Sequence, residues 1–185
     1  MNLATDDRPE HTIDARNRIA SVNPAWVELW HGRAAGFEVI GRPLWDFIEG
    51  VQVRQLWEIL FERVRAVGAP VFVPMRADTA SMRRVWDVEL HPLAENAIRQ
   101  VFEPVWSEKR PAVALLDPAY PRNQQFLPFC HWCNRVQVRI GAWEEIEHAQ
   151  MTLRLEAAES LPSLKTGACT SCKQSLLNTF PARVA

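Results

Sequence analysis

The residues with the clearest chemical potential are the four cysteines, which form two CxxC pairs. The pairs are CHWC and CTSC, and no cysteine lies outside them. A CxxC pair turns two sulfurs toward one point, and two pairs together supply the four thiolates that tetrahedral Zn²⁺ prefers. We therefore predict one structural Zn²⁺ per chain, bound by Cys130, Cys133, Cys169 and Cys172.

Other interpretations of the cysteines stay open. An iron ion or an iron-sulfur cluster uses the same four thiolates. A thioredoxin-like redox pair needs a strand before a helix that starts with CxxC, and the residues before the first pair, Pro128–Cys130, make a poor strand. His131 and His148 could replace a cysteine ligand, although four thiols are already present.

The start of the chain and its composition narrow the class of protein. The first residues are polar and acidic and lack the apolar segment of a signal peptide, so we expect a cytoplasmic protein with reduced thiols rather than disulfides. No apolar run reaches the roughly 18 to 20 residues that span a membrane. A formal net charge of −1 without a basic stripe argues against nucleic acid as a partner.

The first half of the chain predicts two strands and then helices. Residues 11–13 and 19–22 alternate as strands around a turn, and Asn23 and Pro24 are typical of a helix start, with Gly32 at its end. A short helical turn lies between the glycines of GRPLWDFIEG. A longer helix over residues 52–67 carries apolar side chains at spacings of three and four, and Gly68 and Pro70 end it. The members of this predicted stripe are Leu56, Ile59, Leu60, Val64 and Val67.

After this helix the apolar period changes to two. Strands are predicted over about 71–75, 83–93 and 97–106, separated by short turns at 78–82 and 94–96. Short turns between successive strands indicate an antiparallel meander.

In this order of elements, the segment Thr12–Arg110 resembles the PAS family. The matching parts are DARNRIASVN, the NPAW helix start, GRPLWDFI and the three closing strands. The resemblance implies an α+β fold with a PAS-like five-stranded antiparallel sheet, helices on one face and, in many members, a small-molecule pocket. PAS domains are usually sensory or dimerising modules and are seldom enzymes.

The later segment, Phe126–Leu177, resembles a cysteine-rich tail that follows PAS or receiver domains in bacterial proteins. The motifs CHWCNRV, GAWEEIE and LPSLKTGACTSC carry this resemblance, although Lys165 and Thr166 stand where the tail usually has a histidine. We expect a small helical zinc-knuckle module in which WEEIEHAQMTLRLEAAE forms a helix. The predicted organisation is a PAS-like domain over 1–110, a proline-rich linker over 111–125 and a metal module over 126–185.

Cofactors in the PAS-like part are constrained by the residues that are absent. Residues 1–129 contain no cysteine, which excludes flavin-cysteine photochemistry, and the helix over 52–67 contains no histidine to ligate haem. His31 and His91 are the remaining candidates for a haem ligand, and surface roles suit them better. The identity of any PAS ligand stays unknown.

The tryptophans are expected to pack or to cover, not to bind. Four of them should face the sheet or a dimer surface, and two should shield the thiolates from water. The first set is Trp26, Trp30, Trp45 and Trp57, and the second is Trp132 and Trp143.

A polar group, Arg76, Asp78, Arg83 and Arg84, surrounds a predicted hairpin turn. This group is interpreted in one of two ways. It binds an anion or a partner, or it forms a turn in which Asp78 accepts hydrogen bonds and pairs with an arginine.

The sequence offers no nucleophile with an obvious base, no glycine-rich phosphate loop and no paired catalytic carboxylates, so we predict no catalytic residues.

Together these observations predict a non-enzymatic bacterial sensory or signalling adaptor. It would act through a homodimer or a heterologous signalling protein, with a small-molecule ligand as a further partner. One alternative is a redox- or metal-responsive switch that uses the four cysteines, and another is an enzyme that uses the PAS-like pocket.

Overall fold

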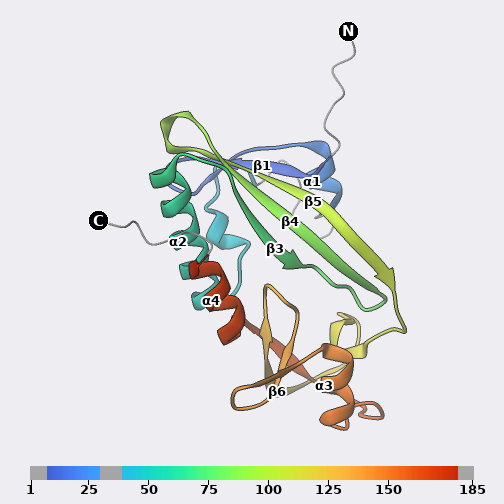
Figure 1. Ribbon diagram of the computed structural model, residues 1–185. Helices are drawn as coiled ribbons and strands as arrows, with labels where there is room; N and C mark the ends of the chain where they lie inside the picture. The colour runs from blue at the N-terminus through green and yellow to red at the C-terminus, as the bar shows by residue number, and fades with distance from the viewer. Residues whose placement is uncertain (1–7, 30–38, 179–185) are drawn as a thin grey trace. The chain divides into compact units, whose positions relative to one another are not determined.

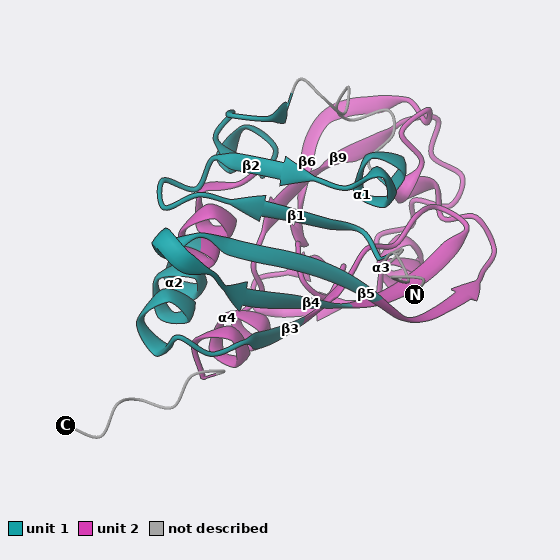
Figure 2. Ribbon diagram, turned by 90° about the horizontal axis from the view of Figure 1, so that it is seen from above, with its two compact units in different colours: residues 1–48, 58–73, 87–103 teal, residues 49–57, 74–86, 104–185 magenta. Residues whose placement is uncertain are grey.

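The computed structural model describes residues 8–29 and 39–178. The chain divides into two compact units that are interleaved in sequence (Figure 2). The first unit comprises residues 1–48, 58–73 and 87–103, and the second comprises residues 49–57, 74–86 and 104–185. Within the described ranges, no helix combines the length and the apolar character that crossing a lipid bilayer requires.

The larger sheet has five strands in the order β2-β1-β5-β4-β3 (Figure 1). Both neighbours of β1 run antiparallel to it, and β3, β4 and β5 follow one another as the predicted meander. The predicted α+β class with a five-stranded antiparallel sheet is therefore confirmed. The strands are β1 Glu10–Ile13, β2 Ile19–Val22, β3 Val71–Arg76, β4 Met82–Pro92 and β5 Ile98–Lys109.

The helix α1, Pro24–Leu29, begins as its sequence predicts. The Asn23 side-chain oxygen accepts the Trp26 N–H at 2.8 Å, which satisfies one of the backbone donors that a helix start leaves unpaired. The predicted end at Gly32 lies outside the described residues, as does Trp30. The predicted short turn is the 3₁₀ helix η2, Leu44–Asp46.

The long helix α2, Val51–Val67, buries one stripe of side chains. Leu56, Leu60 and Val64 lie in it as predicted, but Val67 is 54% exposed, and Ile59 is half-buried. The buried stripe also includes Val53, Trp57 and Phe61, so it is centred on a different side of the helix from the predicted stripe. The Gly68 N–H donates to the Val64 carbonyl at 2.9 Å and closes the helix with a positive φ of 70°.

The second unit contains a mixed four-stranded sheet in the order β8-β7-β6-β9. Strands β6 and β9 are parallel neighbours, so the chain between them must cross over before it returns. The elements of this unit are β6 Arg122–Cys130, β7 Val136–Arg139, β8 Ala142–Glu144, α3 Ile146–Thr152, β9 Leu161–Gly167 and α4 Thr170–Asn178. Its hydrophobic core consists of Val113, Leu115, Val136, Ile146, Ala149 and Leu161.

Three sequence expectations fail in this second unit. The module is a mixed sheet with helices, not a purely helical one, because β6 pairs with a strand more than 30 residues away, and no local pattern predicts that. The expected long helix is only α3, preceded by β8. The segment before Cys130 is a strand, although it was expected to be a poor one. In the proline-rich segment, Val113 and Leu115 are buried in the core.

Trp57 provides a test of this packing. Its side chain is 4% exposed, and its ring lies 6.0 Å from that of Trp132. We expect Trp57→Ala to lower the free energy of unfolding by about 3 to 5 kcal/mol, since a large buried ring leaves a cavity. Urea denaturation measures this, with Trp106→Ala as the matched control because Trp106 is 46% exposed. Equal losses in both variants would contradict the assignment of Trp57 to the core.

Candidate metal centre

The first cysteine pair lies at the end of β6. The Cys130 N–H donates to the Arg135 carbonyl at 2.8 Å, and the Asn134 N–H donates to the Cys130 carbonyl at 2.9 Å. Asn134 has a φ of 56°, in the left-handed region that asparagine tolerates. These contacts fold residues 130–134 into a tight turn, the first knuckle, before β7 begins.

The second pair lies at the start of α4. The Cys169 carbonyl accepts the Lys173 N–H at 3.0 Å, which makes Cys169 the residue that caps the helix. Its sulfur accepts the Cys172 N–H at 3.4 Å, and the Cys130 sulfur accepts the Cys169 N–H at 3.4 Å. Backbone N–H groups at a helix start favour negative charge, so they favour thiolates here.

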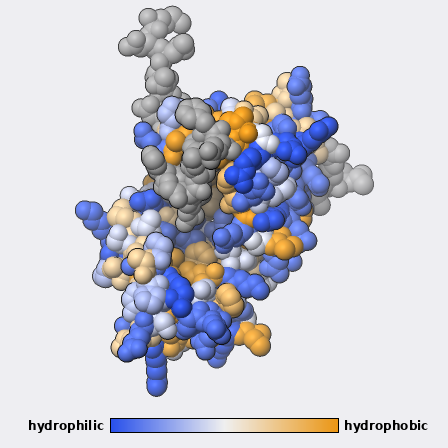
Figure 3. All heavy atoms as spheres, turned by 180° about the vertical axis from the view of Figure 1, so that it is seen from behind, coloured by the Kyte–Doolittle hydropathy of each residue, from blue (hydrophilic) through white to orange (hydrophobic). Residues whose placement is uncertain are grey.

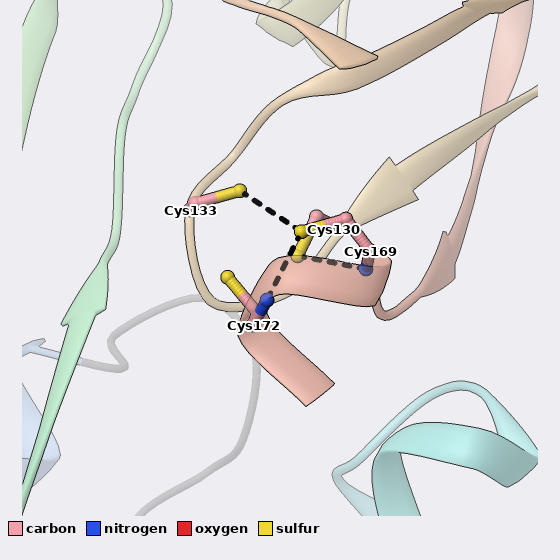
Figure 4. A group of neighbouring side chains, drawn as sticks. All are labelled: Cys130, Cys133, Cys169 and Cys172. Atoms are coloured by element: carbon pink, nitrogen blue, oxygen red, sulfur yellow. Dashed lines mark hydrogen bonds between the residues drawn. The ribbon is translucent and has the colours of Figure 1, made fainter. Parts of the chain in front are cut away.

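The four sulfurs gather at one place (Figure 4). All four lie within 4.8 Å of one another, and those of Cys133 and Cys169 are 3.8 Å apart. Sulfurs about 2.3 Å from a tetrahedral metal lie about 3.8 Å from each other, so the cluster is compatible with a bound metal ion. The structure brings together all four predicted ligands, with Cys130 and Cys169 buried and Cys133 and Cys172 half-buried.

The cluster is electrostatically unstable as four thiolates. Hydrogen bonds from Cys133 and Cys172 hold the pKa of Cys130 well below its usual range. The hydrogen bond that each donates to Cys130 raises the pKa of Cys133 to about 12 and also raises the pKa of Cys172. Like charges oppose one another, so all four sulfurs can be ionised together only around a cation.

The two tryptophans expected to shield the centre, Trp132 and Trp143, differ in how deeply they are buried. Trp132 is 3% exposed, with its ring 5.1 Å from His131. Burial lowers the pKa of His131 to about 4, which keeps its ring neutral. Among the described residues, neither His131 nor His148 belongs to the clustered ligand group. Trp143 is half-buried on β8, opposite Gln137.

The polar group around the hairpin turn forms part of a larger ionic cluster in the second unit. The Asp78 side chain is fully buried and forms ion pairs with Arg76 and with Arg110, the latter at 3.2 Å. Its carboxylate also accepts the Arg84 N–H at 3.1 Å, as the structural interpretation of this turn predicted. The other carboxylates of the cluster are on α3 or immediately before it. The cluster comprises Arg76, Asp78, Arg83, Arg110, Arg135, Glu145 and Glu147.

Sequence reasoning missed the partners of these arginines. Arg76 pairs with Glu145, while Arg83 and Arg110 both pair with Glu147, at 2.7 and 2.6 Å. The one available signal was the pair of glutamates two residues apart at the expected helix start. Each of these arginines is therefore paired with a carboxylate of the chain itself, which disfavours the anion-site interpretation.

Among the described residues of the first unit, His11 and Gln100 have buried side-chain nitrogens without a hydrogen-bond partner. His11 is 4% exposed with both ring nitrogens unpaired, and burial lowers its pKa to about 3. Gln100 faces it across β1 and β5, is 3% exposed, and has an unpaired amide nitrogen. Of the two histidines weighed as haem ligands, His91 contacts Glu89 at 2.8 Å, and His31 lies outside the described residues.

Known proteins resemble this chain in part of its structure, and at low sequence identity. No protein-family model and no curated protein matches the sequence. Three of the solved structures that resemble part of the chain have TM-scores below 0.5. A domain of an HTR-like protein from Haloarcula marismortui is 14% identical with a TM-score of 0.42, and the match covers 55% of this chain and 100% of that chain. The PAS domain of Bordetella pertussis BvgS is 19% identical with a TM-score of 0.38, covering 54% of this chain and 73% of that chain. A domain of a sensory box sensor histidine kinase/response regulator from Geobacter sulfurreducens is 15% identical with a TM-score of 0.35, covering 54% of this chain and 84% of that chain.

Glu147 gives the ionic cluster a pH signature. Burial raises the pKa of its carboxyl, but hydrogen bonds from its own N–H, Arg83 and Arg110 outweigh burial and lower the pKa from 4.5 to about 2. A group with a lowered folded pKa stabilises the protein above its unfolded pKa, and this contribution fades as the pH falls. We expect Glu147→Gln to be less stable than the wild type at pH 7, with the difference shrinking between pH 4.5 and 2.

Urea denaturation of both proteins at each pH measures the difference directly. Because the two chains are compared at the same pH, changes at the cysteines cancel. Glu156→Gln, at an exposed position in the same unit, should show no such trend. A Glu147→Gln difference that stays constant down to pH 2 would contradict the role of its charge.

Proposed function

We propose that the four cysteines bind one structural Zn²⁺ that organises the second unit. The observation that carries this proposal is the meeting of four sulfurs from two knuckles within 4.8 Å. Four-cysteine zinc sites are typically closed and structural, because the protein fills every coordination position. The stabilisation would come from coupling metal binding to the folding of residues 130–172, which join two knuckles that are 35 residues apart.

We propose that the chain as a whole is a non-enzymatic sensory or signalling adaptor of the PAS-like type. The five-stranded antiparallel sheet supports a PAS-like domain. A closed thiolate site offers a substrate no position on the metal, which supports a binding role over catalysis. On this proposal the chain transmits a signal by changing what it contacts.

Metal analysis of the purified protein tests the proposed zinc site. We expect one zinc per chain and no visible absorption. Cys172→Ser should release the metal and increase proteolysis after residue 126, because site formation and local folding are coupled. Ser171→Ala, at an exposed position between the same two cysteines, should keep the metal.

Two outcomes would contradict the zinc proposal. Iron with charge-transfer bands would support the redox-responsive switch, in which the cysteines sense oxidants or metal. A chain in which all four cysteines are replaced by serine, yet whose melting and proteolysis are unchanged, would show that the site has no structural role.

A second candidate function is the binding of a small polar molecule in the first unit. The unpaired nitrogens of His11 and Gln100 favour it, because buried polar groups normally have partners. A neutral imidazole offers one donor and one acceptor, and the Gln100 amide offers a further donor. A native mass spectrum of the same preparation reports such a molecule as mass beyond the chain and its metal.

We further propose that the chain forms a homodimer through the PAS-like part. Most soluble oligomers close as two-fold dimers, and interface cores are enriched in tryptophan. Trp106 and Val105, near the end of β5, are 46% and 55% exposed and supply candidate contacts. The other candidate segment, before β1, is mostly outside the described residues.

Analytical ultracentrifugation tests the dimer. We expect a dimer at micromolar concentration that Trp106→Ala weakens. Ile140→Ala is a control, because Ile140 is fully exposed and lies between β7 and β8, outside the PAS-like part. A chain that stays monomeric over a tenfold rise in concentration would exclude self-association and leave a heterologous partner as the binding proposal.

A further inference from the structure

The outer edge of β3 needs a partner that the sheet itself does not supply. β3 is the last strand of its sheet, so only one of its sides pairs with β4. The Ala77 N–H donates to the Arg84 carbonyl in the β4 direction at 3.1 Å. Because backbone groups alternate in direction along a strand, those of Arg76 and Asp78 point to the opposite side. Pro74, two residues earlier on the same side, has no N–H.

The first knuckle satisfies these outward groups as a strand would. The Arg76 N–H donates to the Trp132 carbonyl at 2.7 Å, and the Asp78 N–H donates to the Asn134 side-chain oxygen at 2.9 Å. The Asn134 side-chain nitrogen returns a hydrogen bond to the Arg76 carbonyl at 3.2 Å. All three contacts lie within the second unit.

Asn134 belongs to the cysteine knuckle and to this edge at the same time. Its backbone N–H closes the turn onto the Cys130 carbonyl, and its side-chain nitrogen also reaches the His131 carbonyl at 3.4 Å. The residue is 4% exposed, so its amide bonds are shielded from water. A shift of the turn therefore moves the amide that holds Asp78.

We propose that Asn134 is a positioning residue that transmits the occupancy of the four-cysteine centre to the outer edge of β3. This inference rests on the proposed metal binding. With metal bound, the two cysteines on either side of the turn fix residues 130–134, and the Asn134 amide closes the edge. Without metal, the turn loosens, and the Arg76 and Asp78 donors are exposed to water and to other strands.

The ionic cluster makes this response local. Arg76 remains paired with Asp78 and Glu145 through its side chain, and these contacts involve neither a cysteine nor Asn134. The Ala77 N–H remains bonded within the hairpin. Loss of metal should therefore open the outer side of β3 while the inner side stays paired.

Amide hydrogen exchange of the full chain, followed by NMR, tests the inference. We expect chelation of the metal to accelerate exchange at Arg76 and Asp78 by about tenfold or more, since each loses a buried hydrogen bond. Exchange at Ala77 in the same hairpin should rise much less. Equal acceleration at all three amides would indicate general unfolding and would overturn the inference.

Substitution of Asn134 tests the role of its side-chain amide while the backbone turn is kept. Asn134→Gly keeps a residue that adopts positive φ but removes the side chain, so we expect bound metal together with fast exchange at Asp78. Asn123→Gly, which removes another amide bonded to the backbone of the second unit, should leave exchange at Asp78 unchanged.

The outcomes distinguish this inference from the proposed metal site. A wild-type chain without metal overturns the metal site. A chain that binds metal, but whose Asp78 exchange is unaffected both by chelation and by Asn134→Gly, overturns the role of Asn134 alone. The chelation experiment uses the wild-type chain, so it decides the matter even if the variant does not fold.

Discussion

The constraint that organises the metal centre of the second unit is the meeting of four sulfurs within 4.8 Å of one another. Hydrogen bonds from its neighbours stabilise the Cys130 thiolate, while the pKa values of Cys133 and Cys172 are raised, so ionisation of all four sulfurs together requires a cation between them. The knuckles come from segments that are 35 residues apart, and a closed site would link their folding. The parallel pairing of β6 with β9 brings the segments together, since Cys130 ends one strand and Cys169 follows the other.

Charge pairing fixes the hairpin around Asp78 within the same unit. A fully buried carboxylate is costly unless it is paired and hydrogen-bonded, and Asp78 has two arginine partners and the Arg84 N–H. Buried ion pairs contribute more to a defined geometry than to net stability, because desolvation offsets their attraction. The cluster therefore defines where the hairpin meets α3, and the knuckle adds the backbone contacts along the edge of β3.

Backbone geometry places Gly50 where no other residue would fit. Its φ is +88°, and a Cβ at this position would lie 2.5 Å from the Thr166 carbonyl oxygen. This approach brings the start of α2 against the end of β9, three residues before Cys169, within the second unit. Trp57, farther along α2, packs near Trp132 in the first knuckle. The first half of α2 thus contacts the segments that carry both cysteine pairs.

The sequence by itself determined the features that depend on near neighbours: the capping of α1 by Asn23, the end of α2 at Gly68, the period-two strands and the two CxxC pairs. Only the tertiary structure decided the pairing of β6 with β9, the shortness of α3, the pairing of Arg76 with Glu145 and the partners of Asn134. The physical reason is that helix caps and apolar periods are local interactions, and their residue types record them. The pairing of β6 with β9 and the contacts of Arg76 with Glu145 and of Asn134 with Asp78 join residues more than 30 positions apart, and a glutamate or asparagine carries no mark of the distant group that it will meet.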